Sequence, residues 1–507
     1  NFLNMKYLYI LLFFLIATQT SVAQFTLSNE KTFGGNSDDH ITAKFEFNNT
    51  YYLFGNSNSP ASGNKSDDSF GQQDIWLICT DLSYNILWDT IYGGAQFEQV
   101  FSVEKVDDGF NLFATSNSGV SGNKTTATFG ESDIWYFKIN YDGEILNQYS
   151  YGGSLSEEVY SGFTLNNNIY IISRSNSLIS GNKTVANFGL FDYWIIKINP
   201  LNGQIIGQVG YGTSNSEQTV SMIPNSSENL VIVGSASGSD GNKQEVGFNS
   251  YDVWLLELDQ NLSLLSEKVF GGVDTEFTND VIEYNTTYYI SSTSNSHISG
   301  NKTSPSFAFE NGDPNWFLRK DIWVLKLDSD FNIIWDKTFG GGGREEGSSI
   351  FYADYDKLVF SCMSESNANG AGNKTTPNYG QEDLWVFITD LDGNILTQQN
   401  FGGTGEDYLG VYPGNSPTEL FLSVYTNSTA SATGNMSVVS NGGFDAWIAD
   451  VDVQNWLTIA EENASKQIKV YPNPTENNVY FSETVERLEI RDAQGKVVQT
   501  LQNTNYT

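Results

Sequence analysis

The stretch Tyr92-Gly93-Gly94-Ala95-Gln96-Phe97-Glu98 is one copy of the motif that decides the fold: an aromatic residue, two small residues and an acid five positions after the first glycine. The motif occurs seven times, and its aromatic residue recurs at spacings of 59, 59, 60, 59, 69 and 62 residues. The seven acids are Asp39, Glu98, Glu157, Glu217, Glu276, Glu345 and Asp407. A recurring period of this length indicates a repeat architecture.

Each repeat contains four short segments that alternate polar and apolar residues or are rich in aromatic residues. In the first repeat these segments are 41–47, 51–54, 74–82 and 85–91, separated by Gly, Asn and Ser turns. Four strands per repeat of about sixty residues are typical of a β-propeller blade. A parallel β-helix would have shorter repeats, and a linear array of small sandwiches would need longer ones.

The two ends of the repeat region predict how the propeller closes. The third strand of each repeat carries Asp-x-Trp, but after the seventh copy, at Asp445 and Trp447, no fourth strand with a Gly-Gly follows. Such a strand stands alone at residues 25–33. We expect it to complete the last blade, because this pairing removes two free sheet edges. The sequence thus predicts an all-β, seven-bladed propeller over residues 25–452, closed by its N-terminal strand.

The Asp-x-Trp tryptophans are predicted to form a structural ring. They are Trp76, Trp135, Trp194, Trp254, Trp323, Trp385 and Trp447. A row of sugar-binding aromatic residues is the alternative. We favour packing between sheets, because truncating a buried Trp costs about 3 to 5 kcal/mol and every blade needs such a layer. The preceding Asp is expected to accept hydrogen bonds from backbone N–H groups of the turn before it.

A second repeated element, Gly-Asn-Lys, lies between the second and third strands, on the face that also carries the Gly-Gly loops. Its lysines are Lys65, Lys124, Lys183, Lys243, Lys302 and Lys374, and the seventh copy has Met436 instead. The ring of acids is the kind of feature that binds calcium through carboxylate oxygens. Because the lysines nearly match the acids in number, we expect structural acid–lysine pairs, no metal and no cofactor, with Asp407 unpaired; calcium is the alternative.

The fifth repeat departs most from the others. It carries an insertion at residues 311–320 on the same face, and the next Gly-Gly loop is also atypical. These departures predict a ligand or partner site at Trp316, Phe317, Arg319, Arg344 and His297. An insertion without a ligand is the alternative.

The composition excludes several classes of function. With 25 basic and 60 acidic residues, the net charge is −35, so no basic surplus exists to bind nucleic acid. Two His and two Cys leave little for a metalloenzyme or a disulfide scaffold. No nucleophile elbow, zinc-protease motif or phosphate loop occurs, so no catalytic residue is assigned. We expect a non-catalytic binding or adhesion module for extracellular glycan or protein, with a carbohydrate-active enzyme that uses channel carboxylates as the alternative.

The N-terminal segment predicts export. Lys6, the apolar run 7–17 and the small residues 21–23 have the layout of a secretory signal peptide over residues 1–23. The run is too short to span a bilayer, which needs about 20 apolar residues. We expect no transmembrane segment in the mature chain.

The C-terminal segment carries Val470-Tyr471-Pro472-Asn473-Pro474 and, later, Asp492-Ala493-Gln494-Gly495-Lys496-Val497-Val498. It resembles the type A C-terminal sorting domain of type IX secretion system cargo in Bacteroidota, a small β-sandwich, over residues 469–507 after a linker at 453–468. The resemblance assigns the sorting motif to Tyr471, Pro472, Asn473, Pro474 and Gly495. Such domains usually continue for several more strands, so we expect a truncated one. The resemblance implies type IX secretion machinery as a partner and an extracellular or outer-membrane surface location.

Overall fold

The computed structural model of the chain describes residues 24–307, 320–353, 356–368, 370–414, 419–428 and 434–454, and four short strands between residues 470 and 504. The chain divides into two compact units, one of which is Ala23–Gln454. Every element with described bounds is a β-strand. No helix in the described ranges is both long and apolar enough to cross a membrane.

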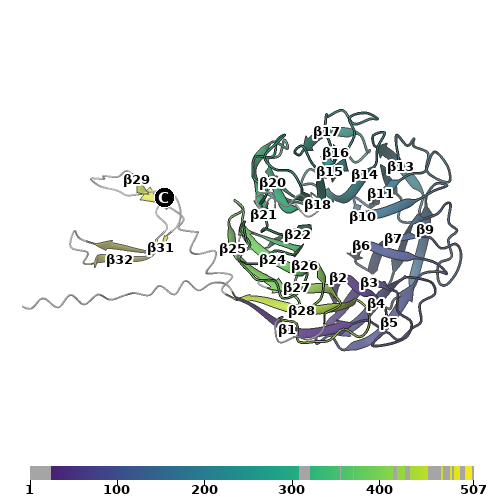
Figure 1. Cartoon of the computed structure of the whole chain (residues 1–507), viewed down its shortest axis with the longest axis horizontal. Helices are drawn as coiled ribbons and strands as arrows, with labels where there is room; N and C mark the ends of the chain where they lie inside the picture. Colours follow the sequence, from purple (N-terminus) through teal and green to yellow (C-terminus); the bar gives the residue numbers. More distant parts are fainter. Residues whose placement is uncertain are drawn as a thin grey trace, which may run out of the picture. The chain divides into compact units, whose positions relative to one another are not determined.

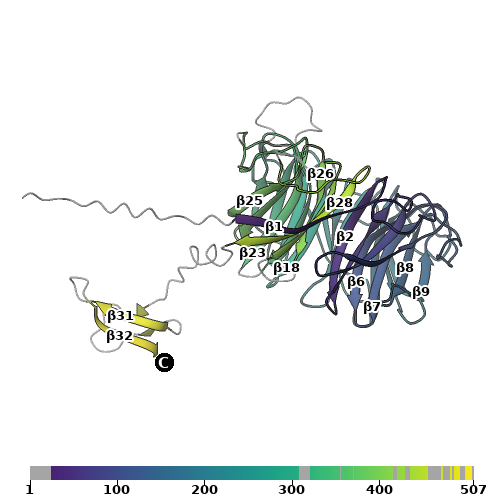
Figure 2. The ribbon, with the colours of Figure 1, turned by 90° about the horizontal axis from the view of Figure 1, so that it is seen from below.

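Seven four-stranded antiparallel sheets form the blades of a ring (Figures 1 and 2). Blade 1 comprises β2 (Asp39–Phe47), β3 (Thr50–Ser57), β4 (Asp74–Asp81) and β5 (Ile86–Tyr92). Blade 2 comprises β6 (Glu98–Val106), β7 (Gly109–Ser116), β8 (Asp133–Ile139) and β9 (Ile145–Tyr151). Blade 3 comprises β10 (Glu157–Leu165), β11 (Asn168–Ser175), β12 (Asp192–Ile198) and β13 (Ile205–Tyr211). The predicted seven-bladed β-propeller is confirmed.

The remaining blades repeat this order. Blade 4 comprises β14 (Glu217–Pro224), β15 (Leu230–Ala236), β16 (Asp252–Leu258) and β17 (Leu264–Phe270). Blade 5 comprises β18 (Glu276–Tyr284), β19 (Thr287–Ser294), β20 (Asp321–Leu327) and β21 (Ile333–Phe339). Blade 6 comprises β22 (Glu345–Ala353), β23 (Lys357–Ser364), β24 (Asp383–Asp390) and β25 (Ile395–Phe401). Each blade begins with its inner strand, which starts at one of the seven acids (Figure 1).

Blade 7 joins the two ends of the propeller. It comprises β26 (Asp407–Pro413), β27 (Glu419–Thr426), β28 (Asp445–Gln454) and β1 (Gln24–Phe33). β1 lies beside β28 as its antiparallel partner, with Thr26 opposite Asp452 and Phe33 opposite Ala446 (Figure 1). The N-terminal strand therefore closes the ring, as the sequence predicts.

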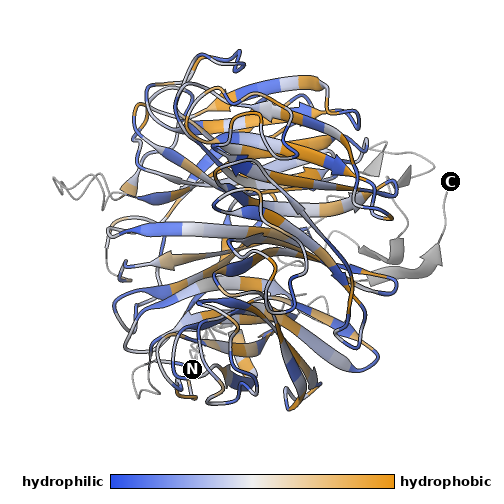
Figure 3. Ribbon diagram, turned by 90° about the vertical axis from the view of Figure 1, so that its right-hand side faces the viewer, coloured by the Kyte–Doolittle hydropathy of each residue, from blue (hydrophilic) through white to orange (hydrophobic). Residues whose placement is uncertain are grey.

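The hydrophobic core lies between neighbouring blades. Trp135 of blade 2 shares one cluster with Ile75 and Leu77 of blade 1, and hydrophobic residues occur along the strands of the sheets in Figure 3. All seven Asp-x-Trp tryptophans are fully buried. Each indole N–H donates to a side chain of the outer strand of its own blade, at 2.8 to 3.2 Å. This burial places the Trp ring in the core, where no sugar reaches it.

The C-terminal strands form two separate pairs. β29 (Val470–Tyr471) pairs with β30 (Tyr480–Phe481), and β31 (Val485–Arg491) pairs with β32 (Val497–Thr504). The predicted signal peptide, the linker beyond Gln454 and the motif residues Pro472, Asn473, Pro474 and Gly495 lie outside the described residues.

Candidate functional site

The seven repeated acids form the joints between neighbouring blades. The N–H of each acid donates to the carbonyl that precedes the Asp of Asp-x-Trp in the previous blade, at 2.6 to 2.9 Å. Its carboxylate accepts the N–H of the second small residue of its own motif, at 2.7 to 3.1 Å. All seven acids are buried. The seven acids therefore hold the turns between blades by hydrogen bonds to backbone groups.

The Gly-Asn-Lys loops pack on the same turns, which defines one face of the ring, the Gly-Gly face. At all seven joints the Asn side chain accepts the N–H of the first glycine, at 2.8 to 3.1 Å. Lys124 shows what the lysines do: its Nζ donates to the carbonyls of Ser118 and Thr126, each at 2.8 Å. The repeated loops thus stabilise one another.

The expected acid–lysine ion pairs are wrong. Within the described ranges, none of the six Gly-Asn-Lys lysines lies within ion-pair distance of a ring acid. The reason is that backbone N–H and serine hydroxyl groups occupy the carboxylates, while backbone carbonyl and hydroxyl oxygens occupy the ammonium groups. Asp407, expected to be unpaired, accepts hydrogen bonds from Gly403 and Ser428, both at 2.9 Å.

The insertion of the fifth repeat leaves its joint intact. In blade 4 the N–H of Phe248 donates to Asp252, four positions ahead, at 2.7 Å. In blade 5 the N–H of Phe307 makes the same bond to Asp321, fourteen positions ahead, at 2.8 Å. The hydrogen bond to the Asp of Asp-x-Trp is therefore kept although ten more residues separate its donor and acceptor in blade 5.

The predicted ligand residues are only partly placed. Trp316, Phe317 and Arg319 lie outside the described residues. His297 follows β19, and its Nδ1 accepts the N–H of Ser306 at 3.3 Å. The predicted ligand or partner site therefore lies only partly within the described residues.

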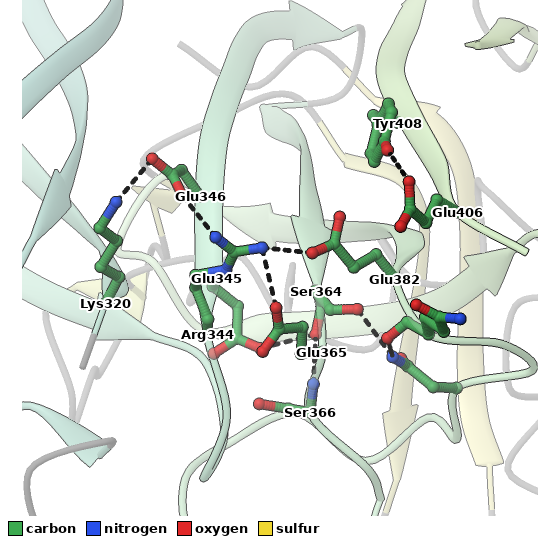
Figure 4. A network of polar contacts seen from close by, with 12 residues as sticks. Lys320, Arg344, Glu345, Glu346, Ser364, Glu365, Ser366, Glu382, Glu406 and Tyr408 are labelled. Atoms are coloured by element: carbon green, nitrogen blue, oxygen red, sulfur yellow. Dashed lines mark hydrogen bonds and ion pairs between the residues drawn. The ribbon is translucent and has the colours of Figure 1, made fainter. Parts of the chain in front are cut away.

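Arg344 is the centre of an ionic network on the Gly-Gly face (Figure 4). Its guanidinium contacts Glu365 at 2.8 Å, Glu346 at 3.6 Å and Glu382, and Lys320 contacts Glu346 at 2.7 Å. Burial, followed by the neighbouring Glu365, raises the pKa of Glu382, while Arg344 opposes that shift. Three carboxylates surround one guanidinium, so Arg344, predicted at the edge of a ligand or partner site, bridges carboxylates on this face.

An aromatic cluster lies in the next blade. The rings of Tyr425 and Phe444 are stacked with centroids 4.6 Å apart, and those of Tyr408 and Phe444 are 5.6 Å apart. The Tyr408 hydroxyl donates to Glu406 (Figure 4). All three rings are half-buried. We call the set of these residues the blade 6–7 sector; its members are Arg344, Glu346, Glu365, Glu382, Glu406, Tyr408, Tyr425 and Phe444.

Sequence reasoning missed most of this sector because it followed the insertion. Tyr408 follows the ring acid of blade 7, and its counterparts in the other blades all differ in chemistry or size. They are His40, Gln99, Glu158, Gln218, Phe277 and Glu346. The available signal for this sector was variation at a fixed repeat position. The residue type changes there from blade to blade, whereas neighbouring positions on the same face repeat.

His40 borders this sector from blade 1. Its ring meets Tyr425 edge-on with centroids 5.6 Å apart, and its Nε2 lies 3.0 Å from the amide nitrogen of Asn56. Burial lowers the pKa of His40 to about 4, so the imidazole is neutral at neutral pH. No cluster of three or more His, Cys, Asp or Glu in the described residues is arranged to hold a metal ion.

The comparisons with known proteins identify no family. No protein-family model matches the chain, and no curated protein matches it. A Dyadobacter fermentans protein of unknown function is similar over 85% of this chain and 99% of its own, at 10% identity and TM-score 0.40. A family 25 ulvan lyase matches over 82% and 97%, at 9% identity and TM-score 0.45. A thermostable family-43 glycoside hydrolase matches over 62% and 95%, at 11% identity and TM-score 0.32.

Proposed function

We propose that this protein is a non-catalytic binding module for an extracellular glycan, and that the blade 6–7 sector is its ligand site. One observation carries the proposal: half-buried aromatic rings lie beside a network of carboxylates and a guanidinium, at positions that vary on an otherwise repeated face. Sites for small ligands combine apolar and aromatic walls with a few placed polar groups. The C–H face of a sugar suits the rings, and its hydroxyl groups suit the charged acceptors and donors.

The repeated residues support this choice by exclusion. The ring acids, the Gly-Asn-Lys loops and the buried tryptophans are occupied by contacts within and between blades. Residues that differ from blade to blade at one repeat position do not take part in these repeated contacts. A ligand that recognises this face therefore meets its distinguishing chemistry at the variable positions.

The test compares two double variants of the full chain on a panel of extracellular polysaccharides. Tyr408→Ala/Tyr425→Ala removes two rings of the sector, and Gln99→Ala/Phe277→Ala changes the Tyr408 position in blades 2 and 5. If each ring contributes about 0.5 to 1.5 kcal/mol, the first variant binds about 5-fold to 150-fold more weakly. The second should bind like the wild type. Equal affinity of the first variant and the wild type for every retained glycan contradicts the site.

A carbohydrate-active enzyme is the second candidate, and one observation favours it. Glu382 has a raised pKa and lies against Glu365, and an environment of this kind can tune a carboxyl group for general acid catalysis. New reducing ends released from a polysaccharide by the wild type, and lost in Glu382→Gln, would establish the enzyme. Retention without cleavage supports the binding module.

We also propose export by the type IX secretion machinery to the cell surface or the medium. The signal-peptide layout around Lys6 and the Tyr471-Pro472-Asn473-Pro474 motif support this route. Fractionation of a bacterium that has the type IX system, compared with a strain that lacks it, tests the route. Equal surface and medium levels in the two strains contradict it.

A further inference from the structure

Each joint of the ring brings two carboxyl groups together. At the joint of blades 1 and 2, a Cβ placed on Gly93 would lie 1.9 Å from Asp74 Oδ1 and 2.9 Å from Glu98 Oε2. The same convergence of an Asp-x-Trp aspartate and the next ring acid occurs at Gly34, Gly152, Gly271, Gly340 and Gly402. Like charges this close inside a protein repel strongly unless a proton or a counter-ion lies between them.

At six joints the Asp-x-Trp aspartate has one oxygen that no donor in the described part of the chain reaches. Asp74 Oδ2 accepts the N–H of Phe70 at 2.6 Å and of Gly71 at 3.2 Å. No donor in the described part of the chain reaches the buried Oδ1. The same holds for Asp133, Asp192, Asp252, Asp383 and Asp445. A recurring buried acceptor without a donor needs an explanation, and a proton on this oxygen converts it into a donor.

The joint of blades 3 and 4 shows the arrangement most directly. The carboxyl groups of Asp192 and Glu217 lie within hydrogen-bonding reach of each other. Such a bond requires a proton on one of them, because two carboxylates offer only acceptors. Glu217 accepts the Thr213 hydroxyl at 2.6 Å and the Thr213 N–H at 3.1 Å. Both carboxyl groups are buried.

We propose that Asp192 and Glu217 share one proton at neutral pH. The carboxyl pairs at the other joints share a proton in the same way, at lower pH. The propeller is thereby a ring of proton-bridged joints that is more stable in mild acid than in alkali.

The charged and titratable groups around this joint are Lys183, Lys243 and Tyr193. Lys183 donates to the carbonyls of Ser177 and Val185, and Lys243 to those of Gly238 and Glu245, so neither ammonium bonds a carboxylate of the pair. The Tyr193 hydroxyl donates to backbone carbonyls. Because these three groups bond backbone carbonyls, a shared proton is what can join the two carboxyl groups.

The direction of the pH effect follows from the shifts. Burial, with a smaller contribution from Asp192, raises the pKa of Glu217 to about 8, and burial raises those of Asp74, Asp383 and Asp445 to about 6. At pH values above the ordinary carboxyl pKa values, the folded protein therefore keeps protons on these carboxyl groups, whereas the unfolded chain has released them. The stabilisation is complete below about pH 4. It falls between about pH 4 and 8 as the joints lose their protons, and the last loss is at Glu217.

The experiment measures urea unfolding of the full chain from pH 5 to pH 8, together with its infrared spectrum at pH 7. We expect a carboxylic acid C=O band in the folded wild type that disappears on unfolding. In Glu217→Gln, the amide can donate a hydrogen bond in place of the shared proton, so unfolding releases one proton fewer than in the wild type. The unfolding constant of this variant should therefore rise about tenfold less per pH unit than that of the wild type, between the pKa values of Glu217 in the unfolded and the folded chain.

Glu131→Gln is the matched control, because it makes the same change at an exposed glutamate. It should keep the wild-type slope. Equal slopes for the two variants overturn the proposal. If Glu217→Gln does not fold, the wild-type infrared spectrum decides: absence of a protonated carboxyl band at pH 7 overturns the proposal, and its presence in the folded state alone supports it.

Discussion

Thr213 and Gly238 show how single residues fit together at a joint. In blades 2 and 3 the second small residue of the motif is glycine, and a Cβ on Gly153 would lie 2.3 Å from the Cβ of Ser177. At the next joint Thr213 replaces this glycine and Gly238 replaces the serine, and a Cβ on Gly238 would lie 2.3 Å from that of Thr213. The two positions share space for one side chain. The hydroxyl that reaches the ring acid therefore comes from either partner.

This exchange predicts a rescue in blade 3. Gly153→Thr should destabilise the protein by about 1 to 3 kcal/mol, because its side chain overlaps Ser177. Ser177→Gly loses the 2.9 Å hydrogen bond from the N–H of Leu155. The double variant recreates the arrangement of blade 4, so its cost should be below the sum of the single costs by about 0.5 to 3 kcal/mol. Urea unfolding of the four proteins measures the coupling, and additive costs contradict the shared space.

At the scale of elements, the closing joint between blades 7 and 1 contains a buried ion pair. Lys44 of β2 contacts Asp450 of β28 at 3.3 Å, and the Tyr84 hydroxyl donates to the same carboxylate at 2.5 Å. The Lys44 ammonium also lies over the rings of Tyr51 and Phe421, at 4.5 and 4.3 Å from their centroids. This cluster fastens blade 1 to the strand that pairs with the N-terminus.

Removing one partner of this pair should be costly. The side chains of Lys44 and Asp450 are 4% and 5% exposed, so Asp450→Ala leaves an unpaired ammonium in the interior and should destabilise by about 3 to 5 kcal/mol. Lys44→Met/Asp450→Ala should recover much of that loss. The control is Asp108→Ala, which breaks a pair with Lys138 whose acid is 64% exposed and should cost about 0 to 1 kcal/mol. Similar unfolding midpoints for Asp450→Ala and Asp108→Ala would refute the role of the buried pair.

At the scale of the whole molecule, the features that could be predicted from the sequence are those that its repeated motifs determine. The period of the Gly-Gly motif and the missing last strand after Trp447 are sufficient for seven blades and their closure, because strand pairing obeys the same pattern in each copy. Lys44 and Asp450 stand at positions of their blades where the other blades carry different residue types, and they are 406 residues apart, so only the closed ring brings them together. The blade 6–7 sector around Tyr408 was not predicted for a related reason. Its residues differ from their counterparts in the other blades, and the repeat pattern reports only the positions at which blades agree.

Ring closure leads to a prediction for the whole chain. A chain without residues 24–33 loses the outer strand of blade 7, including buried Phe33 and Glu30, which accepts the indole N–H of Trp447 at 3.2 Å. It should be less stable by at least about 3 kcal/mol, given the burial of one Phe and the loss of a strand ladder. A synthetic peptide of residues 24–33 should bind the shortened chain and raise its urea midpoint, whereas a scrambled peptide should not. Because β28 offers this peptide an edge that the full chain has already covered, binding by the shortened chain alone is the signature of closure. A shortened chain as stable as the full one contradicts it.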